Sequence, residues 1–317
     1  MRASIHNYIA SCTQCARHNI LRTKSPGHLK SIKLPSDVFQ VLHMDFWGPV
    51  RTASTRGNRY VIILTDNLSK YVIADALPDC TAKSAAQFFI ERFILHHGAP
   101  ERLITDNGTH FNNHLLRAIT SSMNIAHAFS VSYHPQTNGQ VERVNATFTA
   151  QLAKYCDPDQ SDWDLYLPSI VYAYNTSIHS IAKFTPYELA FARSPKSPFD
   201  STSPILILPP AHIFYPYLQR TRRLITAKAR TNILHHQSYW AQRYNQNRRD
   251  PVYRVGDLVY VQVSTDRTKL DARRLGPFIV IQTSGQQHYL VKDNLTGRTD
   301  WYHVNQLYPV IERHHYY

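Results

Sequence analysis

Cysteine, methionine and glycine are scarce in this chain of 317 residues, which holds 4, 3 and 10 of them. Four cysteines are too few for a disulfide framework and are typical of a reducing compartment. No apolar run approaches the ~20 residues that a membrane-spanning helix needs, and Arg2, His6 and Asn7 interrupt any apolar stretch at the start. A disulfide-rich secreted domain and a membrane protein are therefore not expected.

Acidic residues are also few, since 22 Asp and Glu stand against 35 Lys and Arg and give a net charge of +13. The deficit is uneven: residues 201–249 hold eight Lys or Arg and no acid at all. A solvated helical face normally mixes both signs, so this segment favours an anionic partner, most simply nucleic acid. The 20 tyrosines suit stacking on bases and bonding to phosphates.

The spacing of apolar residues predicts an α/β fold. Strands are expected at residues 38–47, 60–64, 71–76, 102–105 and 126–131. Helices are expected at residues 81–97, 113–123, 141–155, 163–175 and 185–193. Residues 134–140 should form a polar loop, because Pro135 and Gly139 break regular structure. Three strands followed by alternating helices and strands indicate a mixed sheet.

The two ends of the chain have patterns of their own. The first 20 residues predict a helix that ends in Cys12-Thr-Gln-Cys15. Prolines crowd residues 195–210, and a long helix is expected at 212–249. Four short strands predict a small SH3-like β-barrel, and they are expected at residues 257–263, 277–282, 288–292 and 300–304.

Three carboxylates stand out from this pattern. Asp45 interrupts an otherwise apolar strand, so its charge needs a partner such as a metal ion. Asp106 precedes the turn signal Asn107-Gly108, and Glu142 stands near the start of an expected helix. Each has an ordinary explanation by itself, as a surface acid, a turn residue or a favourable first-turn charge. Together, acids that converge from separate elements can hold two divalent ions that drive an in-line attack on a phosphodiester.

Several stretches around and beyond these acids carry a family resemblance. They are His43-Met-Asp-Phe-Trp-Gly-Pro49, Ile104-Thr-Asp-Asn-Gly-Thr-His-Phe111, Tyr133-His-Pro-Gln-Thr-Asn-Gly-Gln-Val-Glu-Arg143, Tyr172-Ala-Tyr-Asn175, Phe184-Thr-Pro-Tyr-Glu-Leu189, Leu275-Gly-Pro-Phe278 and His303-Val-Asn-Gln-Leu307. They resemble the integrases of retroviruses and long-terminal-repeat retrotransposons, most closely the Ty3/Gypsy class. The 35 residues between Asp106 and Glu142 match the D,D(35)E signature of that family.

This resemblance implies an RNase H-like core in which Asp45, Asp106 and Glu142 bind two Mg²⁺ or Mn²⁺ ions through oxygen. It implies a polynucleotidyl transferase that processes the 3′ ends of element DNA and transfers them into target DNA. The implied partners are double-stranded element ends, target DNA and further copies of the chain. The implied place of action is the nucleus, with a cytoplasmic particle as an earlier stage.

The resemblance also suggests which residues contact DNA. In and beside the predicted loop they are Tyr133, Gln136, Asn138, Gln140, Arg143 and Asn145. For Gln136 and Asn138, an ordinary loop position is an equal alternative. In the basic segment the candidates are Arg220, Arg222, Arg223, Lys228 and Arg230.

By the same resemblance the chain divides into six parts. They are an incomplete zinc-binding module (1–20), a linker (21–37), the catalytic core (38–194), a proline-rich linker (195–210), a basic helical segment (211–249) and a C-terminal DNA-binding β-barrel (250–312). Cys12 and Cys15 have the spacing of half a zinc site, but relatives complete it with an upstream pair of histidines. Zinc is therefore not expected to bind the chain as it stands.

Three other functions are weighed against this interpretation. A cut-and-paste transposase shares the three acids, but the C-terminal motifs argue against it. An RNase H-type nuclease would need a fourth acid, for which Asp66 and Asp75 are candidates without a supporting motif. A decayed or host-adopted integrase that only binds DNA is the alternative from another functional class. The missing half of the zinc site supports it, and the intact carboxylates argue against it.

Overall fold

The structure is a computed structural model, and its described part covers most of the chain. The described residues are 5, 8, 9, 11–20, 22–29, 33–129, 135–196, 210–263, 268, 270–285 and 287–311, with the backbone alone described at 135–144 and 211. The chain forms two compact units. We call Ser31–Ser238 the core unit, and Met1–Lys30 together with Tyr239–Tyr317 the terminal unit.

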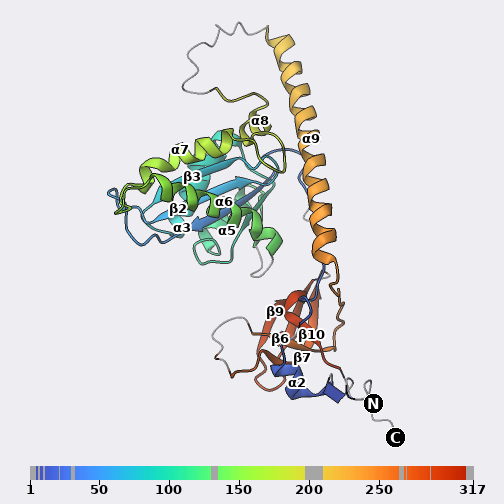
Figure 1. The fold of residues 1–317 in the computed structure, drawn as a ribbon. Coiled ribbons are helices and arrows are strands. Elements are labelled where there is room, and N and C mark those ends of the chain that lie inside the picture. Colours follow the sequence, from blue (N-terminus) through green and yellow to red (C-terminus); the bar gives the residue numbers. More distant parts are fainter. Residues whose placement is uncertain are drawn as a thin grey trace. The chain divides into compact units, whose positions relative to one another are not determined.

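A five-stranded mixed sheet forms the centre of the core unit (Figure 1). Its strands are β1 (Val41–Trp47), β2 (Tyr60–Asp66), β3 (Val72–Leu77), β4 (Arg102–Thr105) and β5 (Ala126–Phe129). They lie in the order β3-β2-β1-β4-β5. β1, β2 and β3 are antiparallel neighbours, whereas β4 runs parallel to both β1 and β5. The predicted mixed-sheet α/β fold is therefore confirmed.

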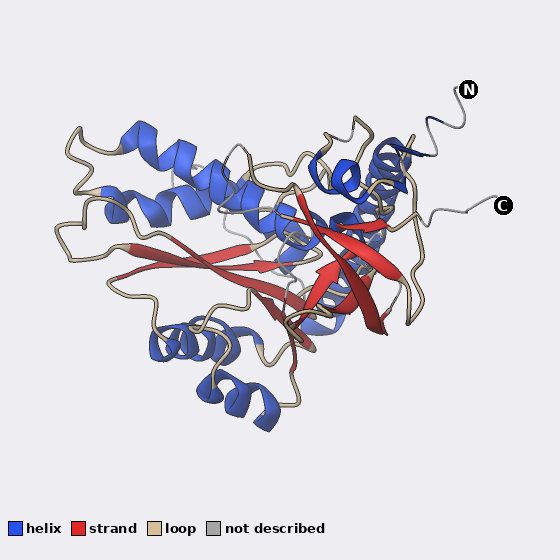
Figure 2. Ribbon diagram, turned by 90° about the horizontal axis from the view of Figure 1, so that it is seen from below, coloured by secondary structure: helices blue, strands red, loops and turns tan. Residues whose placement is uncertain are grey.

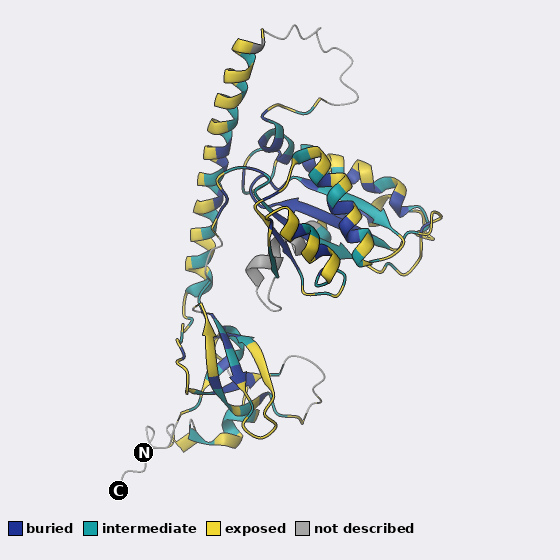
Figure 3. Ribbon diagram, turned by 180° about the vertical axis from the view of Figure 1, so that it is seen from behind, coloured by how far each residue is buried: buried dark blue, intermediate teal, exposed yellow. Residues whose placement is uncertain are grey.

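Helices cover both faces of this sheet (Figure 2). They are α3 (Ala82–Phe88), the π-helical turn η1 (Phe89–Ile94), α4 (Leu95–His97), α5 (His114–Ser122), α6 (Pro135–Tyr155), α7 (Trp163–Thr176) and α8 (Pro186–Phe191). Leu42, Met44 and Ile62 face α3, η1 and α5 in one apolar cluster. Val61 and Ile63 face α6 and α7 in another. The period-two alternation of strand side chains separates these two cores, and the buried strands between them are visible in Figure 3.

Helix α6 differs from the prediction at its start. The expected loop at residues 134–140 is wrong from Pro135 onward, because α6 begins at that residue. Proline is well suited to the first helical position, where its missing N–H would have no partner and its φ is already helical. Glu142 consequently lies in the third turn of α6, one turn before Asn145, and not in the first turn of a shorter helix.

The basic segment forms one long helix, α9 (Ala211–Asn245), which confirms the helix predicted at 212–249 within a few residues. Its part up to Ser238 belongs to the core unit. There Ala229 and Ile233 are buried with Leu34, Val38 and Leu68, so α9 packs on the segment that precedes β1 and on the turn after β2. The opposite side of this part of α9 leaves its polar and charged residues exposed.

The terminal unit contains a second five-stranded sheet, which is antiparallel and compatible with an SH3-like barrel. Its elements are β6 (Leu258–Gln262), β7 (Arg274–Ser284), β8 (His288–Lys292), β9 (Thr299–His303), the 3₁₀ turn η2 (Val304–Gln306) and β10 (Leu307–Pro309). Its core includes Val259, Val280 and Tyr289. In the described part of the chain, no helix is both long and apolar enough to cross a membrane.

A short helix, α2 (Thr13–His18), packs against β7 in the same unit. Cys12 is its N-cap, and the Cys12 Sγ accepts a hydrogen bond from the Cys15 backbone N–H at 3.4 Å. Residues 5, 8, 9 and 11 are helical, as expected, and Cys12 is not. The predicted helix end at Cys15 is wrong, because Cys15 lies inside α2, which continues to His18. Arg274 of β7 fixes the end of α2 by donating from Nη2 to the Asn19 carbonyl at 2.9 Å.

Candidate active site

The strand pairing brings Asp45 and Asp106 together. β1 and β4 are parallel neighbours, with Val41 opposite Arg102 and His43 opposite Ile104. Continuing this register by two residues puts Asp45 level with Asp106, which directly follows β4. Two carboxylates from strands 61 residues apart in sequence thus meet at one edge of the core sheet.

A residue of α6 contacts Asp45 of this pair. Asn145 Nδ2 donates a hydrogen bond to Asp45 Oδ2 at 3.1 Å. Asn145 Oδ1 is buried and has no hydrogen-bond partner among the described residues. Because Asp45 alternates with Met44 along β1, its side chain lies on the face of the sheet that α6 and α7 cover. Asn145 therefore ties the middle of α6 to the acidic edge of β1.

Asp106 is held by the turn that follows it. Its Oδ1 accepts a hydrogen bond from the Gly108 backbone N–H at 3.0 Å and lies 3.4 Å from His110 Nε2. A Cβ at Gly108 would overlap the His110 ring, so glycine leaves the room for this ring to fold back over the turn. The contact with His110, followed by the Gly108 N–H, lowers the pKa of Asp106.

The two carboxylates differ in their electrostatic environment. The pKa of Asp45 is raised to about 6, mainly by burial and also by the nearby charge of Asp106, although the hydrogen bond from Asn145 acts in the opposite direction. The pKa of Asp106 is lowered, so the largely buried Asp45 must ionise next to a like charge. A cation at this edge would relieve that repulsion and favour both charged forms.

These observations fit a divalent metal ion. The donor set consists of carboxylate oxygens, with the spare Oδ1 of Asn145 close by, and hard cations such as Mg²⁺ and Mn²⁺ prefer oxygen ligands. Among the described side chains, no three His, Cys, Asp or Glu residues gather as a metal site. The side chain of Glu142, the third acid expected there, lies outside the described residues.

The structure describes the other predicted DNA-contact residues to different extents. Tyr133 lies outside the described residues. For Gln136, Asn138, Gln140 and Arg143 the structure describes only the backbone, which belongs to α6. The predicted basic residues all lie on the part of α9 in the core unit: Arg220, Arg223 and Lys228 are exposed, and Arg222 and Arg230 are half-buried.

The two acids considered for a nuclease have structural partners. Asp66 is buried and accepts hydrogen bonds from the Phe39 N–H at 2.8 Å and the Ser69 N–H at 2.7 Å. Asp75 pairs with Arg92 at 2.6 Å. Both acids therefore already have strong local partners.

His110 is a site residue to which sequence analysis gave no role. It stands four residues after Asp106 inside a recognised motif, but a loop residue four positions away has no fixed direction. Its contact depends on the tight turn at Gly108, which the sequence does not specify in detail. Asn145 was expected to contact DNA, and the structure shows that it also contacts Asp45.

The raised pKa of Asp45 has a consequence for stability. Asp45→Asn should increase the free energy of unfolding of the metal-free protein by about 1–2 kcal/mol at pH 8. The folded-state pKa lies above the ordinary value of 3.8, so the cost of ionising Asp45 is fully present above pH 6 and fades as the pH falls toward 4. Urea unfolding in EDTA at pH 8 and pH 4 measures this difference. Equal stability of both proteins at pH 8 would contradict the assigned environment.

Comparison with known proteins gives a consistent picture. Residues 35–135 match the family described as "Integrase core domain", a range that includes Asp45 and Asp106 and ends before Glu142. The chain is 29% identical over 247 residues to the Retrovirus-related Pol polyprotein from transposon 412 of Drosophila melanogaster, which covers 77% of the chain and 20% of that polyprotein. It is 26% identical over 298 residues to the Transposon Tf2-3 polyprotein of Schizosaccharomyces pombe, with 91% and 22% covered. The chain thus spans about a fifth of the length of these relatives.

A solved structure shares the fold. It is a chain of the simian T-cell lymphotropic virus intasome in complex with PP2A regulatory subunit B56 gamma, with a TM-score of 0.61 and 18% sequence identity. The match covers 98% of this chain and 91% of that one.

Proposed function

We propose that the chain belongs to the family of retroviral and retrotransposon integrases and that it joins the 3′ ends of element DNA to target DNA. The observation that carries the proposal is the meeting of Asp45 and Asp106 at one sheet edge, with α6 tied to Asp45 through Asn145. Glu142 lies one turn before Asn145, so helix geometry puts both residues on the same side of α6. We assign Glu142 as the third carboxylate of the site.

The proposed chemistry has two steps at the same carboxylates. In 3′ processing, water attacks a phosphodiester near the element end and releases a 3′ hydroxyl. In strand transfer, that hydroxyl attacks a phosphodiester of target DNA, so one phosphodiester forms while another breaks. Two divalent ions, when bound to Asp45, Asp106 and Glu142, supply a Lewis acid at the nucleophile and at the leaving oxygen.

The protein residues then have separate tasks. Asp106 stays ionised because His110 and the Gly108 N–H stabilise its charge, and it thus provides a permanently anionic ligand. Asn145 fixes the rotamer of Asp45 through its Nδ2 donor. No side chain has to form a covalent bond to DNA, since the nucleophile is water or a DNA hydroxyl.

DNA would be held by charge outside the carboxylate site. The basic residues of α9 give the core unit a cationic helix, and phosphate contacts of this kind release counterions. We infer that several copies of the chain act together on double-stranded DNA, in the nucleus. Zinc is given no part in this proposal.

A strand-transfer assay tests the function. A short labelled duplex that copies a processed element end should be joined to plasmid DNA in Mn²⁺ or Mg²⁺ and remain unjoined in EDTA. Duplex affinity, measured by anisotropy, should fall at least ~10-fold between about 50 and 200 mM salt. Binding of the duplex without metal-dependent joining would overturn the proposal and favour a DNA-binding remnant of an integrase.

A further inference from the structure

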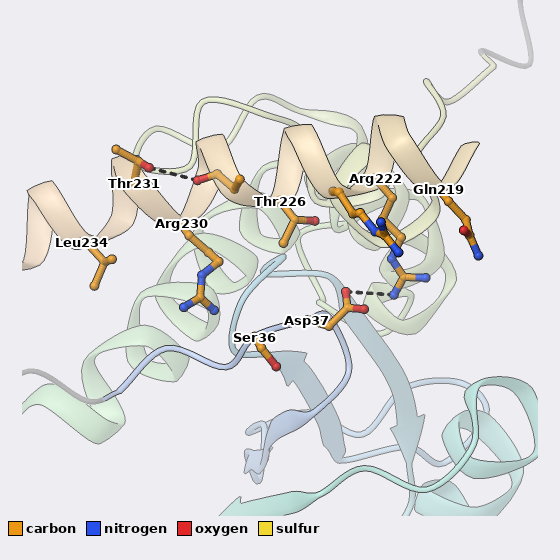
Figure 4. Close-up of a pocket in the computed structure, with 10 residues that line it drawn as sticks. Ser36, Asp37, Gln219, Arg222, Thr226, Arg230, Thr231 and Leu234 are labelled. Atoms are coloured by element: carbon orange, nitrogen blue, oxygen red, sulfur yellow. Dashed lines mark hydrogen bonds and ion pairs between the residues drawn. The ribbon is translucent and has the colours of Figure 1, made fainter. Parts of the chain in front are cut away.

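A hollow of about 500 Å³ lies in the core unit, between α9 and the segment just before β1. Its walls include Asp37, Arg222, Arg223, Thr226, Arg230 and Thr231. Figure 4 shows Arg222 and Arg230 extending from α9 toward the segment that carries Ser36 and Asp37. Three guanidinium groups against one carboxylate leave this hollow strongly cationic.

The polar atoms in the walls are only partly satisfied. Thr226 is 7% exposed, yet its hydroxyl has no hydrogen-bond partner among the described residues. A threonine hydroxyl in a helix can instead donate to the backbone carbonyl four residues earlier. Thr231 of α9 does so, since its hydroxyl donates to the Ala227 carbonyl at 3.0 Å. Arg222 Nε and Arg230 Nη1 are also buried without a partner. Three unpaired donors in one hollow are costly unless a ligand accepts from them.

Asp37 partly neutralises the hollow. Its Oδ1 lies 3.0 Å from Arg222 Nη2, and it is the single acid among the lining residues. The same oxygen also accepts a hydrogen bond from the Val38 N–H at 2.8 Å, which holds the carboxylate in place. Asp37 therefore pairs with one arginine and leaves Arg223 and Arg230 without an acidic partner in the hollow.

We propose that this hollow binds a phosphate of the DNA backbone, held by Arg222, Arg230 and the hydroxyl of Thr226. A phosphodiester offers two anionic oxygens, which suit the planar fork of arginine and a nearby hydroxyl donor. The volume leaves room for the flanking sugars. The identity of the ligand as DNA rests on the proposed function, whereas the anion site rests on the geometry of the hollow. Neither Asp45 nor Asp106 lines the hollow, so it would position DNA and take no part in the chemistry.

A matched pair of variants of the full chain tests the site. Arg230→Gln should weaken binding of a short duplex about tenfold at ~100 mM salt and reduce the salt slope by about one. Arg56→Gln removes the same charge from an exposed turn of the core unit that does not line the hollow, and it should weaken binding about twofold or less. Thr226→Val, which keeps the shape but loses the hydroxyl, should weaken binding about threefold.

A gain of affinity separates the proposal from misfolding. Asp37→Asn removes the competing acid, so it should strengthen duplex binding about threefold, which a poorly folded variant could not do. Inorganic phosphate, added at constant ionic strength, should raise the melting temperature of the wild type and of Arg56→Gln but not that of Arg230→Gln.

Each outcome decides the proposal. It is overturned if Arg230→Gln and Arg56→Gln bind the duplex equally. It is also overturned if phosphate stabilises through the hollow while duplex binding is unaffected by Thr226→Val and Arg230→Gln. In the second case the hollow takes a free phosphate compound and not DNA. A wild-type protein that does not bind the duplex would instead count against the proposed function itself.

Discussion

Replacing Asp106 with asparagine is expected to reduce strand transfer at least ~10³-fold, because the site loses a fixed anionic group at the reacting phosphodiester. Asp106 is the acid whose charge the protein stabilises, through His110 and the Gly108 N–H. Asparagine has nearly the same shape and can accept the same backbone hydrogen bond, but it cannot bind a divalent ion with comparable strength. The rate of joining, measured with excess Mn²⁺, gives the effect.

The control for Asp106→Asn is Asp159→Asn, which removes a carboxylate from an exposed loop of the same unit. It should leave the joining rate within about twofold, in line with most surface substitutions. Both variants should keep duplex affinity close to that of the wild type, because binding depends on the basic residues. A joining rate for Asp106→Asn within tenfold of the wild type would show that the chemistry happens elsewhere.

Phe89→Ala is expected to destabilise the core unit by about 3–5 kcal/mol. Phe89 is 0% exposed, stacks on Phe93 at a ring distance of 6.2 Å, and belongs to the apolar cluster between the sheet and the helices α3 and α5. Removing the ring leaves a cavity that the surrounding strands cannot close. Given domain stabilities of about 5–15 kcal/mol, this loss should lower the melting temperature of the core unit by about 10 °C.

Leu95→Ala is the matched control. Leu95 is the first residue of α4, which directly follows η1, and it is 73% exposed. It should change stability by no more than about 0.5 kcal/mol. Calorimetry of the full chain can follow the two compact units separately, and only the transition of the core unit should move in Phe89→Ala. A loss below about 1 kcal/mol in that variant would contradict the assigned packing.

Much of the fold follows from local patterns of residues. The alternation of Leu42, Met44 and Phe46 with His43 and Asp45 predicts both the strand and its two faces, because strand side chains alternate with a period of two. The start of α6 does not follow in this way. Pro135 is compatible with a loop and with a first helical turn, and the sequence alone does not decide between them.

The site is predictable in its acids but not in their environment. Asp45 and Asp106 stand out by local context, and the strand register brings them together. The hydrogen bond from Asn145 and the contact with His110 depend on how α6 and a short turn pack, which is tertiary information. The hollow along α9 joins Asp37 to residues some 190 positions away, so only the fold reveals it. From sequence alone, Arg222 and Arg230 look the same as the exposed Arg220.

The central claim is that Glu142 on α6 completes a metal-dependent site with Asp45 and Asp106. The most direct measurement is strand transfer by the wild type and Glu142→Gln side by side, in Mn²⁺ and in EDTA, with duplex affinity measured on the same samples. We expect joining by the wild type in Mn²⁺ alone, and a loss of at least ~10³-fold in Glu142→Gln with duplex affinity retained. Joining by Glu142→Gln at a rate near that of the wild type would contradict the account.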